Sequence, residues 1–150
     1  MVSAFRNFSG ETAMHQFEAA YLATTYEVYP PGQQFDLFIA RENQPFSLYC
    51  QNHGIAHWAI ITAYNPYSKT LADEQNYRLN DQLAAELKQQ GVSVCPAVGV
   101  PEDSDWQPEL SFFALNISRS LAARLGRQFQ QNAIVVGGDQ GVADLLWLND

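Results

Sequence analysis

Residues 57–91 decide the fold, and their sequence is HWAIITAYNPYSKTLADEQNYRLNDQLAAELKQQG. The first part, from Trp58 to Ala63, is an apolar run without polar alternation, which is typical of a strand buried on both faces. Tyr64, Asn65 and Pro66 end this run, because a proline biases the residue before it to extended geometry and lacks a backbone donor. We therefore predict a central strand over residues 58–64. The polar junction after it is either a plain turn or the place where a ligand binds.

A long helix over about residues 70–90 follows the junction. Leucines spaced by multiples of four positions give it one apolar face, at Leu71, Leu79, Leu83 and Leu87. Thr70 can cap the start, while Asp73 and Glu74 suit the positive end of the helix dipole. Gly91 is a natural stop. Asn76 interrupts the apolar face, and it faces either the junction or a loop.

Further elements lie on both sides of this stretch. Before it we predict a helix over residues 9–24, a hairpin over 25–40 and a short helical piece within 43–54. After it we predict strands at 92–100, 111–117, 132–138 and 142–148, with a helix that begins after Ser118 and precedes the third of them. Pro96 belongs on an edge strand or at a bulge, because it cannot donate to a ladder. Residues 137–141 read as a hairpin turn.

The order of elements from residue 58 onward is strand, helix, strand, strand, helix, strand. This is the order of the split βαβ core of ferredoxin-like folds. We therefore predict a single α+β domain over residues 1–150. The hairpin and the last strand would extend a mixed sheet, with the helices mainly on one face. A three-layer doubly wound sheet is the alternative, but it needs more crossover helices than the sequence offers.

Composition restricts the function classes. The formal net charge is -8, from 16 acidic against 8 basic residues, which argues against a nucleic-acid partner because such proteins present a basic face. No apolar run approaches the ~20 residues of a membrane helix, and the N-terminal residues lack the apolar centre of a secretory signal. We expect a cytoplasmic protein with no membrane partner and with Cys50 and Cys95 buried and reduced. The cysteines and histidines do not assemble a zinc site, so no metal is expected.

Three segments carry a family resemblance. They are AIITAYNPYSKTLADEQNYRLNDQL at 59–83, DWQPELSFFALNI at 105–117 and GRQFQQNAIVV at 126–136. The first resembles the I-T-A-aromatic-N-P strand end of a bacterial domain-of-unknown-function family, number 3293. The last resembles that family's Phe-x-Gln-x-Ala segment, with Gln130 where the family pattern has glycine. The resemblance covers roughly residues 20–148 and implies a small bacterial cytoplasmic domain with no assigned activity.

The first candidate site residues lie in the junction. In α/β sheets the carboxyl end of a strand beside a helix N-terminus is the usual place for a ligand. Donors, acceptors and one cation are available there from Tyr64, Asn65, Ser68 and Lys69. The alternative is an Asx-Pro turn in which Ser68 or Thr70 caps the helix.

Other candidates come from distant parts of the chain: Asn76, Glu109, Gln131 and Asn132. Glu109 is the best single carboxylate for acid–base chemistry, although no partner is visible in the sequence. Gln131 and Asn132 either line the site or satisfy helix-end carbonyls. We expect Asn65, Ser68, Asn76 and Asn132 to share one polar crevice. If the strands next to Asn65 and Asn132 run parallel, however, those two residues lie at opposite ends of the sheet.

Three function classes fit these residues. The first is a module that binds a small polar metabolite or nucleotide near the junction, which its uncharged polar character favours. The second is an enzyme that uses Glu109, Tyr64 or Tyr67 as acid or base, and the third is a protein-interaction domain. The cofactor stays unknown, because the glycines at 137–141 lack the G-K-[ST] of a phosphate loop. The oligomeric state is not predicted either.

Overall fold

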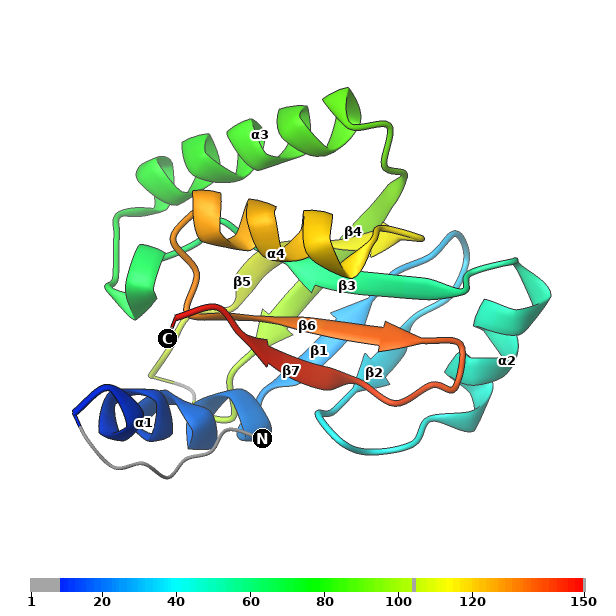
Figure 1. Ribbon diagram of the computed structural model, residues 1–150, viewed down its shortest axis with the longest axis horizontal. Coiled ribbons are helices and arrows are strands. Elements are labelled where there is room, and N and C mark those ends of the chain that lie inside the picture. The colour runs from blue at the N-terminus through cyan, green and yellow to red at the C-terminus, as the bar shows by residue number, and fades with distance from the viewer. Residues whose placement is uncertain (1–8, 104, 150) are drawn as a thin grey trace.

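The computed structural model describes residues 9–103 and 105–149, with side chains from residue 16 onward. Within these residues the fold is built on one seven-stranded sheet, in the order β2-β1-β4-β5-β3-β6-β7 (Figure 1). The strands are β1 (Thr25–Val28), β2 (Phe35–Leu37), β3 (His57–Ile61), β4 (Val94–Val100), β5 (Glu109–Leu115), β6 (Ala133–Gly138) and β7 (Asp144–Trp147). The helices are α1 (Ser9–Ala23), α2 (Gln44–Asn52), α3 (Asp73–Gln89) and α4 (Arg119–Gln128), with a short 3-10 helix η1 (Pro66–Ser68).

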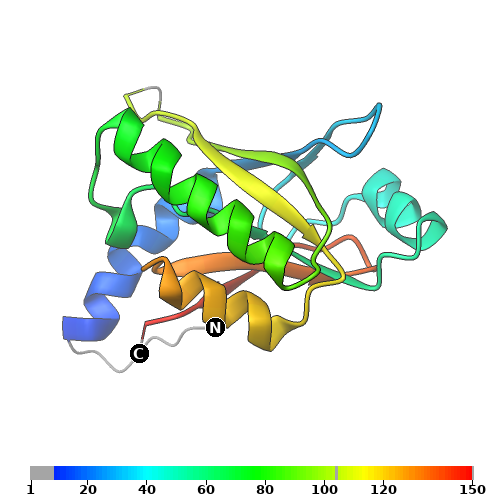
Figure 2. The ribbon, with the colours of Figure 1, turned by 90° about the horizontal axis from the view of Figure 1, so that it is seen from above.

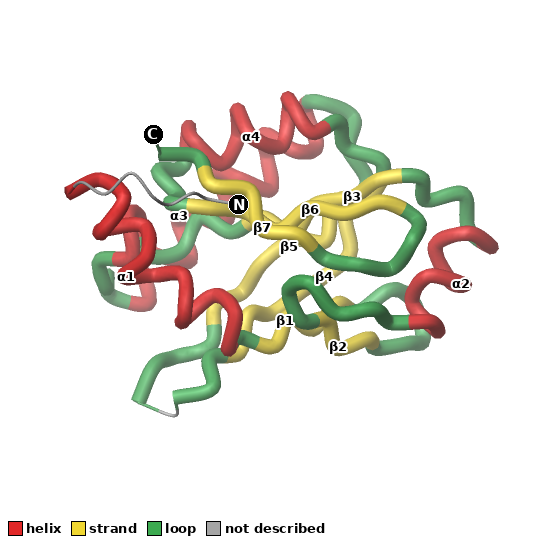
Figure 3. Tube along the Cα trace, turned by 60° about the horizontal axis from the view of Figure 1, so that its bottom comes forward, coloured by secondary structure: helices red, strands yellow, loops and turns green. Residues whose placement is uncertain are grey.

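The sheet curls until its two edge strands approach each other. Ile39, just after β2, forms a bridge with Ala143, just before β7, and a second bridge joins Glu42 to Val142. The backbone N–H of Ala40 donates to the Ala143 carbonyl at 2.7 Å. The sheet is therefore a half-barrel with an inner and an outer face (Figure 3).

Each face of the sheet has its own apolar core. On the inner face Trp58 and Phe113 pack around Phe46 of α2, and the ring centroids of Phe46 and Trp58 lie 5.4 Å apart. On the outer face α3 and α4 lie side by side over the sheet (Figure 2), and Leu83 of α3 and Leu125 of α4 enter that core. Helices α1 and α2 lie at opposite ends of the half-barrel (Figure 1).

The expectation of a buried central strand is confirmed. Strand β3 lies inside the sheet between β5 and β6, and its residues 58–61 are all buried. Successive side chains of a strand point to opposite faces, so Trp58 and Ile60 enter the inner core while Ala59 and Ile61 enter the outer one. The predicted hairpin also forms, because β1 and β2 pair antiparallel, and β6 and β7 pair antiparallel as well. The turn between β6 and β7 begins later than the predicted residues 137–141, since Gly137 and Gly138 still belong to β6.

The prediction of a ferredoxin-like core with a mixed sheet is wrong. All six strand pairings are antiparallel, and the sheet is a curled seven-stranded half-barrel rather than a mixed sheet covered mainly on one face. The mixed sheet is excluded by the crossovers. Helix α3 joins β3 to β4 and helix α4 joins β5 to β6, but an antiparallel strand lies between the members of each pair. No two neighbouring strands are therefore parallel.

Two local predictions also need correction. Helix α3 begins at Asp73, three positions after Thr70, and the Gln75 side-chain oxygen accepts the backbone N–H of Ala72 at 3.1 Å in place of a threonine cap. Pro96 does not lie on an edge strand, because β4 is inside the sheet. Its carbonyl accepts the N–H of Tyr29, one residue past the end of β1. The backbone nitrogen and the carbonyl of a strand residue point toward the same neighbouring strand. The nitrogen of Pro96, which has no hydrogen to donate, therefore points toward the place where β1 ends.

Leu83→Ala should destabilise the protein by roughly 2–5 kcal/mol, as expected when a fully buried leucine is truncated. Leu83 is 0% exposed and lies between α3 and the outer face of the sheet. Urea unfolding followed by circular dichroism measures the loss. Gln82→Ala, one position earlier on the exposed side of α3, is the control and should change stability by less than about 0.5 kcal/mol.

Gly137→Ala should destabilise the protein far more than Gly138→Ala. A methyl group at position 137 would lie 2.2 Å from Cζ2 of Trp58, whereas at position 138 the nearest atom, the Ala56 carbonyl oxygen, is 3.5 Å away. Trp58 is buried and its indole N–H donates to the Gly138 carbonyl at 2.9 Å, so the ring cannot move away freely. Thermal unfolding of the two variants checks this, and equal melting temperatures would contradict it.

Candidate functional site

One end of the half-barrel collects the candidate residues, and we call it the site rim: residues 62–68, 76, 80, 99–100, 109–111 and 131–133. β3 ends there and β5 begins there, because Ile61 pairs with Phe112 and the two strands are antiparallel. β6 also begins there, because β3 and β6 are antiparallel. Asn132, just before β6, therefore lies at the same end as Asn65, just after β3. The alternative in which these residues lie at opposite ends is excluded.

The junction is built around Asn65 and Asn76. The Asn65 backbone N–H donates to Oδ1 of Asn76 at 2.8 Å, and Nδ2 of Asn76 donates to Oδ1 of Asn65 at 2.9 Å. The same Asn65 oxygen accepts the backbone N–H of Leu71 at 3.0 Å. Asn76 is only 3% exposed, so the polar residue that interrupts the face of α3 is turned toward the junction.

The junction has a left-handed backbone at three positions. Asn65, Tyr67 and Ser68 have φ values of 48°, 54° and 64°. Each such residue costs about 1–3 kcal/mol and persists only where its surroundings fix it. The Asn65–Asn76 pair supplies part of that fixation, and the backbone N–H of Tyr67, which donates to the Gln130 carbonyl at 2.7 Å, supplies more.

Asn80 is a buried neighbour of the junction that was not among the predicted site residues. Its Oδ1 accepts the backbone N–H of Ala63 at 2.8 Å, and its Nδ2 donates to the Leu110 carbonyl at 3.0 Å. It thus links the segment just after β3 to the first residues of β5. The signal was present in the sequence, because Asn80 lies one helical turn after Asn76 and so shares its face of α3.

The segment before β6 reaches the junction through two amides. Nδ2 of Asn132 donates to the Ser68 hydroxyl oxygen at 2.8 Å. Nε2 of Gln131 donates to the Tyr64 carbonyl at 3.0 Å and to the Phe129 carbonyl at 3.3 Å. Gln131 therefore satisfies a helix-end carbonyl and also holds the junction. Gln130 has a φ of 58°, a conformation that glycine adopts without strain and that suits the glycine of the family pattern.

Glu109 is the acidic member of the site rim. Its Oε2 accepts Nδ2 of Asn65 at 2.9 Å, and this contact bridges segments 44 residues apart. Burial raises the pKa of the Glu109 carboxyl above its ordinary value, and the bond from Asn65 opposes that rise only in part. Such a carboxyl is poised to exchange a proton or to accept a donor from a ligand.

Two tyrosines that were not among the predicted site residues lie near this carboxyl. Burial and the nearby charge of Glu109 raise the pKa of Tyr21 to about 12, against hydrogen bonds from Ser68 and from the Ala133 backbone. The pKa of Tyr26 is also raised, first by burial and then by the neighbouring Tyr21, with a smaller contribution from the charge of Glu109. Tyr64 is similar, with its pKa raised by burial first and by Tyr77 next. The place of Tyr21 depends on how α1 packs, for instance through its edge-on contact with Trp147 at 5.5 Å.

Seven of the eight candidates therefore belong to one cluster at the site rim: Tyr64, Asn65, Ser68, Asn76, Glu109, Gln131 and Asn132. Lys69 is the exception. It is exposed, and its backbone N–H donates to the Pro66 carbonyl. No hydrogen bond or ion pair joins its ammonium group to another side chain in the described part of the chain.

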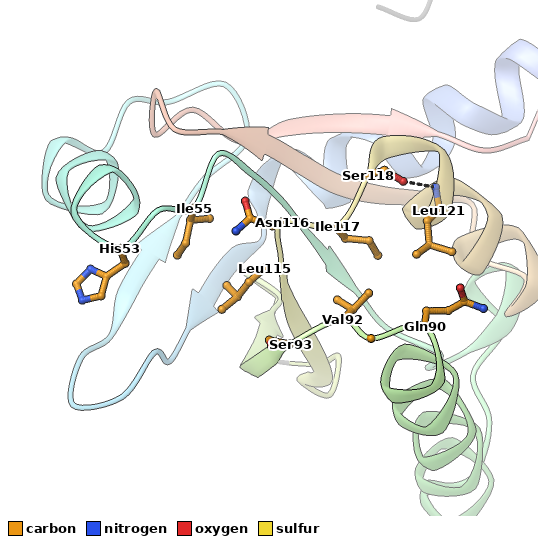
Figure 4. A pocket seen from close by; sticks show the side chains of 11 residues that line it. His53, Ile55, Gln90, Val92, Ser93, Leu115, Asn116, Ile117, Ser118 and Leu121 are labelled. Atoms are coloured by element: carbon orange, nitrogen blue, oxygen red, sulfur yellow. Dashed lines mark hydrogen bonds between the residues drawn. The ribbon is translucent and has the colours of Figure 1, made fainter.

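Two surface hollows lie outside this cluster. One, of about 430 Å³, lies at the opposite end of the sheet between His53, Val92 and Leu121 (Figure 4). Two of its polar side chains are already hydrogen-bonded, because the Asn116 amide bonds Ala56 and Gly54 and the Ser118 hydroxyl caps α4. The other, of about 540 Å³, lies between α3 and α4 and borders the junction at Pro66.

Residues 9–103 and 105–149 hold no group of three or more His, Cys, Asp or Glu side chains that could bind a metal ion. Among the same residues no helix is both long enough and apolar enough to cross a membrane.

A comparison with protein families supports the resemblance drawn from the sequence. The family model described as "Protein of unknown function (DUF3293)" matches residues 61–134. The matched segment contains all eight candidates, whereas Tyr21 and Tyr26 lie outside it. No significant match was found among curated proteins or among solved structures.

Glu109→Gln should raise the melting temperature at neutral pH and leave it nearly unchanged in acid. A carboxyl whose pKa is higher in the folded chain than its ordinary 4.5 binds its proton more tightly when folded. Its stabilising effect is thus present below about pH 4.5 and is lost as the pH rises through the folded pKa. Glutamine keeps an acceptor for Asn65 and carries no charge to desolvate.

Melting curves of both proteins between about pH 4 and pH 8 test this window. The control is Glu102→Gln in the exposed loop between β4 and β5, which should change the melting temperature little at any pH. A Glu109→Gln protein that melts below the parent across the whole range would show that the carboxylate stabilises the fold instead.

Proposed function

We propose that this domain binds a small polar ligand at the site rim. The observation that carries the proposal is the bond between Asn65 and Glu109. A plain turn needs Asn65 to bond only to its own backbone, as it does at Leu71. The turn gains nothing from a distant, largely desolvated carboxyl, whose burial costs free energy. Proteins keep such groups where they act on something else.

The arrangement of the amides supports the same function. Asn76, Asn80 and Asn132 are buried and hydrogen-bonded to backbone or side chains at the site rim. A satisfied network of this kind holds its members rigidly, and rigid polar groups are what a specific binding site requires. The groups that it holds are the Glu109 carboxyl, bonded by Asn65, and the Ser68 hydroxyl, bonded by Asn132.

Proton transfer is the second candidate function, and the raised pKa of Glu109 favours it. A general acid or base works best when its pKa lies near the working pH, and burial moves Glu109 in that direction. The charge of that carboxyl contributes to the raised pKa of the Tyr21 phenol. A bound ligand would be the substrate of such an enzyme, so binding is the property to test first.

The proposal includes a cytoplasmic location. Cys50 and Cys95 are buried free thiols, and burial raises the pKa of the Cys50 thiol to about 11, with a further contribution from Asp139. Thiols in this state suit a reducing compartment.

Native mass spectrometry of freshly purified protein tests the binding function. We expect a bound mass on the parent protein, and we expect Ser68→Gly to lose it. Glycine removes the hydroxyl but accepts the left-handed backbone at that position, so the variant should fold. Ser120→Ala, exposed on α4, is the control and should keep the mass.

A thermal-shift screen of amines, amino acids, sugars and nucleosides complements this measurement. If the parent protein carries no bound mass and no compound of the screen raises its melting temperature, the site rim is a structural cluster and the proposal is wrong.

A further inference from the structure

The charge of Glu109 has no basic partner in the described part of the chain. Among the side chains of residues 16–103 and 105–149 it forms no ion pair, and Asn65 is the one hydrogen-bond donor to its carboxyl. That bond uses Oε2 and leaves Oε1 available. Buried or half-buried carboxylates are normally paired, so a positively charged group of a ligand would complete this one.

Aromatic rings flank the same carboxyl. Tyr26 pairs with Gly99 across β1 and β4, and Gly99 pairs with Glu109 across β4 and β5, so the three lie in one row. A methyl group at Gly99 would lie 3.8 Å from Cε1 of Tyr26 and 4.0 Å from the Glu109 carbonyl oxygen. The glycine thus leaves space between the tyrosine ring and the glutamate. Tyr21 adjoins Tyr26, because the Tyr26 hydroxyl donates to the Tyr21 carbonyl at 3.5 Å, and the charge of Glu109 contributes to the raised pKa of the Tyr21 phenol.

Hydrogen bonds within the cluster already use part of the donor capacity of the junction amides. Nδ2 of Asn65 donates to Glu109 and Nδ2 of Asn132 donates to Ser68, while Asn76 is bonded to Asn65. Lys69, the cation of the junction, is exposed and outside the cluster. A phosphate or carboxylate ligand would meet one carboxylate and few free donors, and the chain charge of -8 would repel it further.

We propose that the ligand is an organic ammonium compound, whose cationic nitrogen binds the Glu109 carboxylate beside Tyr21 and Tyr26. This inference rests on the proposed binding function and names the chemistry of its ligand. A carboxylate supplies the charge and a strong charge-assisted hydrogen bond. The tyrosine rings supply the cation–π attraction that recurs in ammonium recognition. A ligand with a neutral or anionic group at this position would lack both.

Three probes with the same four-carbon chain test the charge requirement. They are 1,4-diaminobutane, which is cationic, 1,4-butanediol, which is neutral, and succinate, which is anionic. Ligand-observed NMR or calorimetric titration should show saturable binding of the diamine alone. Glu109→Gln should weaken that binding at least about tenfold, because removing one member of a desolvated charge pair costs more than 1.4 kcal/mol. Glu102→Gln, which removes an equal charge from an exposed loop, should leave it unchanged.

The outcomes separate the two proposals. Binding of the diol or of succinate as strong as that of the diamine would overturn the inference, and so would diamine binding that Glu109→Gln does not change. If the diamine fails to bind while a native bound mass disappears in Ser68→Gly, the ammonium inference is wrong and the binding function stands. If the diamine fails to bind and no bound mass is found, both proposals are wrong.

Discussion

The position of β3 between β5 and β6 is the constraint on which the rest of the structure depends. Both faces of β3 are buried, and both of its edges are hydrogen-bonded to neighbouring strands. Polar side chains can therefore gather only beyond its two ends, one of which lies after Ile61. The chain places Thr62, Tyr64 and Asn65 there, at the end where β5 and β6 begin. The polar site rim follows directly from the apolar strand.

The site rim combines a costly group with a rigid support. Asn76 and Asn80 project from one face of α3, and each holds a backbone group of the residues that leave β3. This support fixes the left-handed junction and presents the Asn65 amide to Glu109. The carboxyl itself is held by one donor and disfavoured by burial. The amides thus stabilise the fold, whereas burial of the Glu109 carboxyl costs free energy. Such a division is common where a protein has to bind something.

Local elements were predictable from the sequence, whereas their arrangement was not. The long helix and β3 follow from patterns of three to seven residues, and so does the clustering of Asn65 with Asn76 across a short junction. The sheet order depends on which distant strand inserts beside β3, and no local pattern records that β5 does so. The expectation of a mixed sheet failed for this reason. The doubt over Asn132 is resolved by the same fact, since β6 runs opposite to β3. Tyr21 and Tyr26 carry no local signal, because their place is set by α1 and by the pairing of β1 with β4.

The closure of the half-barrel bears on how copies of this protein behave toward one another. An open sheet presents unpaired main-chain groups at its edge strands, which invite intermolecular strand addition and aggregation. Here the segment after β2 bridges the segment before β7, so part of each edge is consumed within the molecule. Charged residues stand beside the remainder, at Asp36 on β2, at Arg41 and Glu42 after it, and at Asp144 on β7. A chain with nearly half of its residues hydrophobic is thereby protected from polymerising through its own sheet.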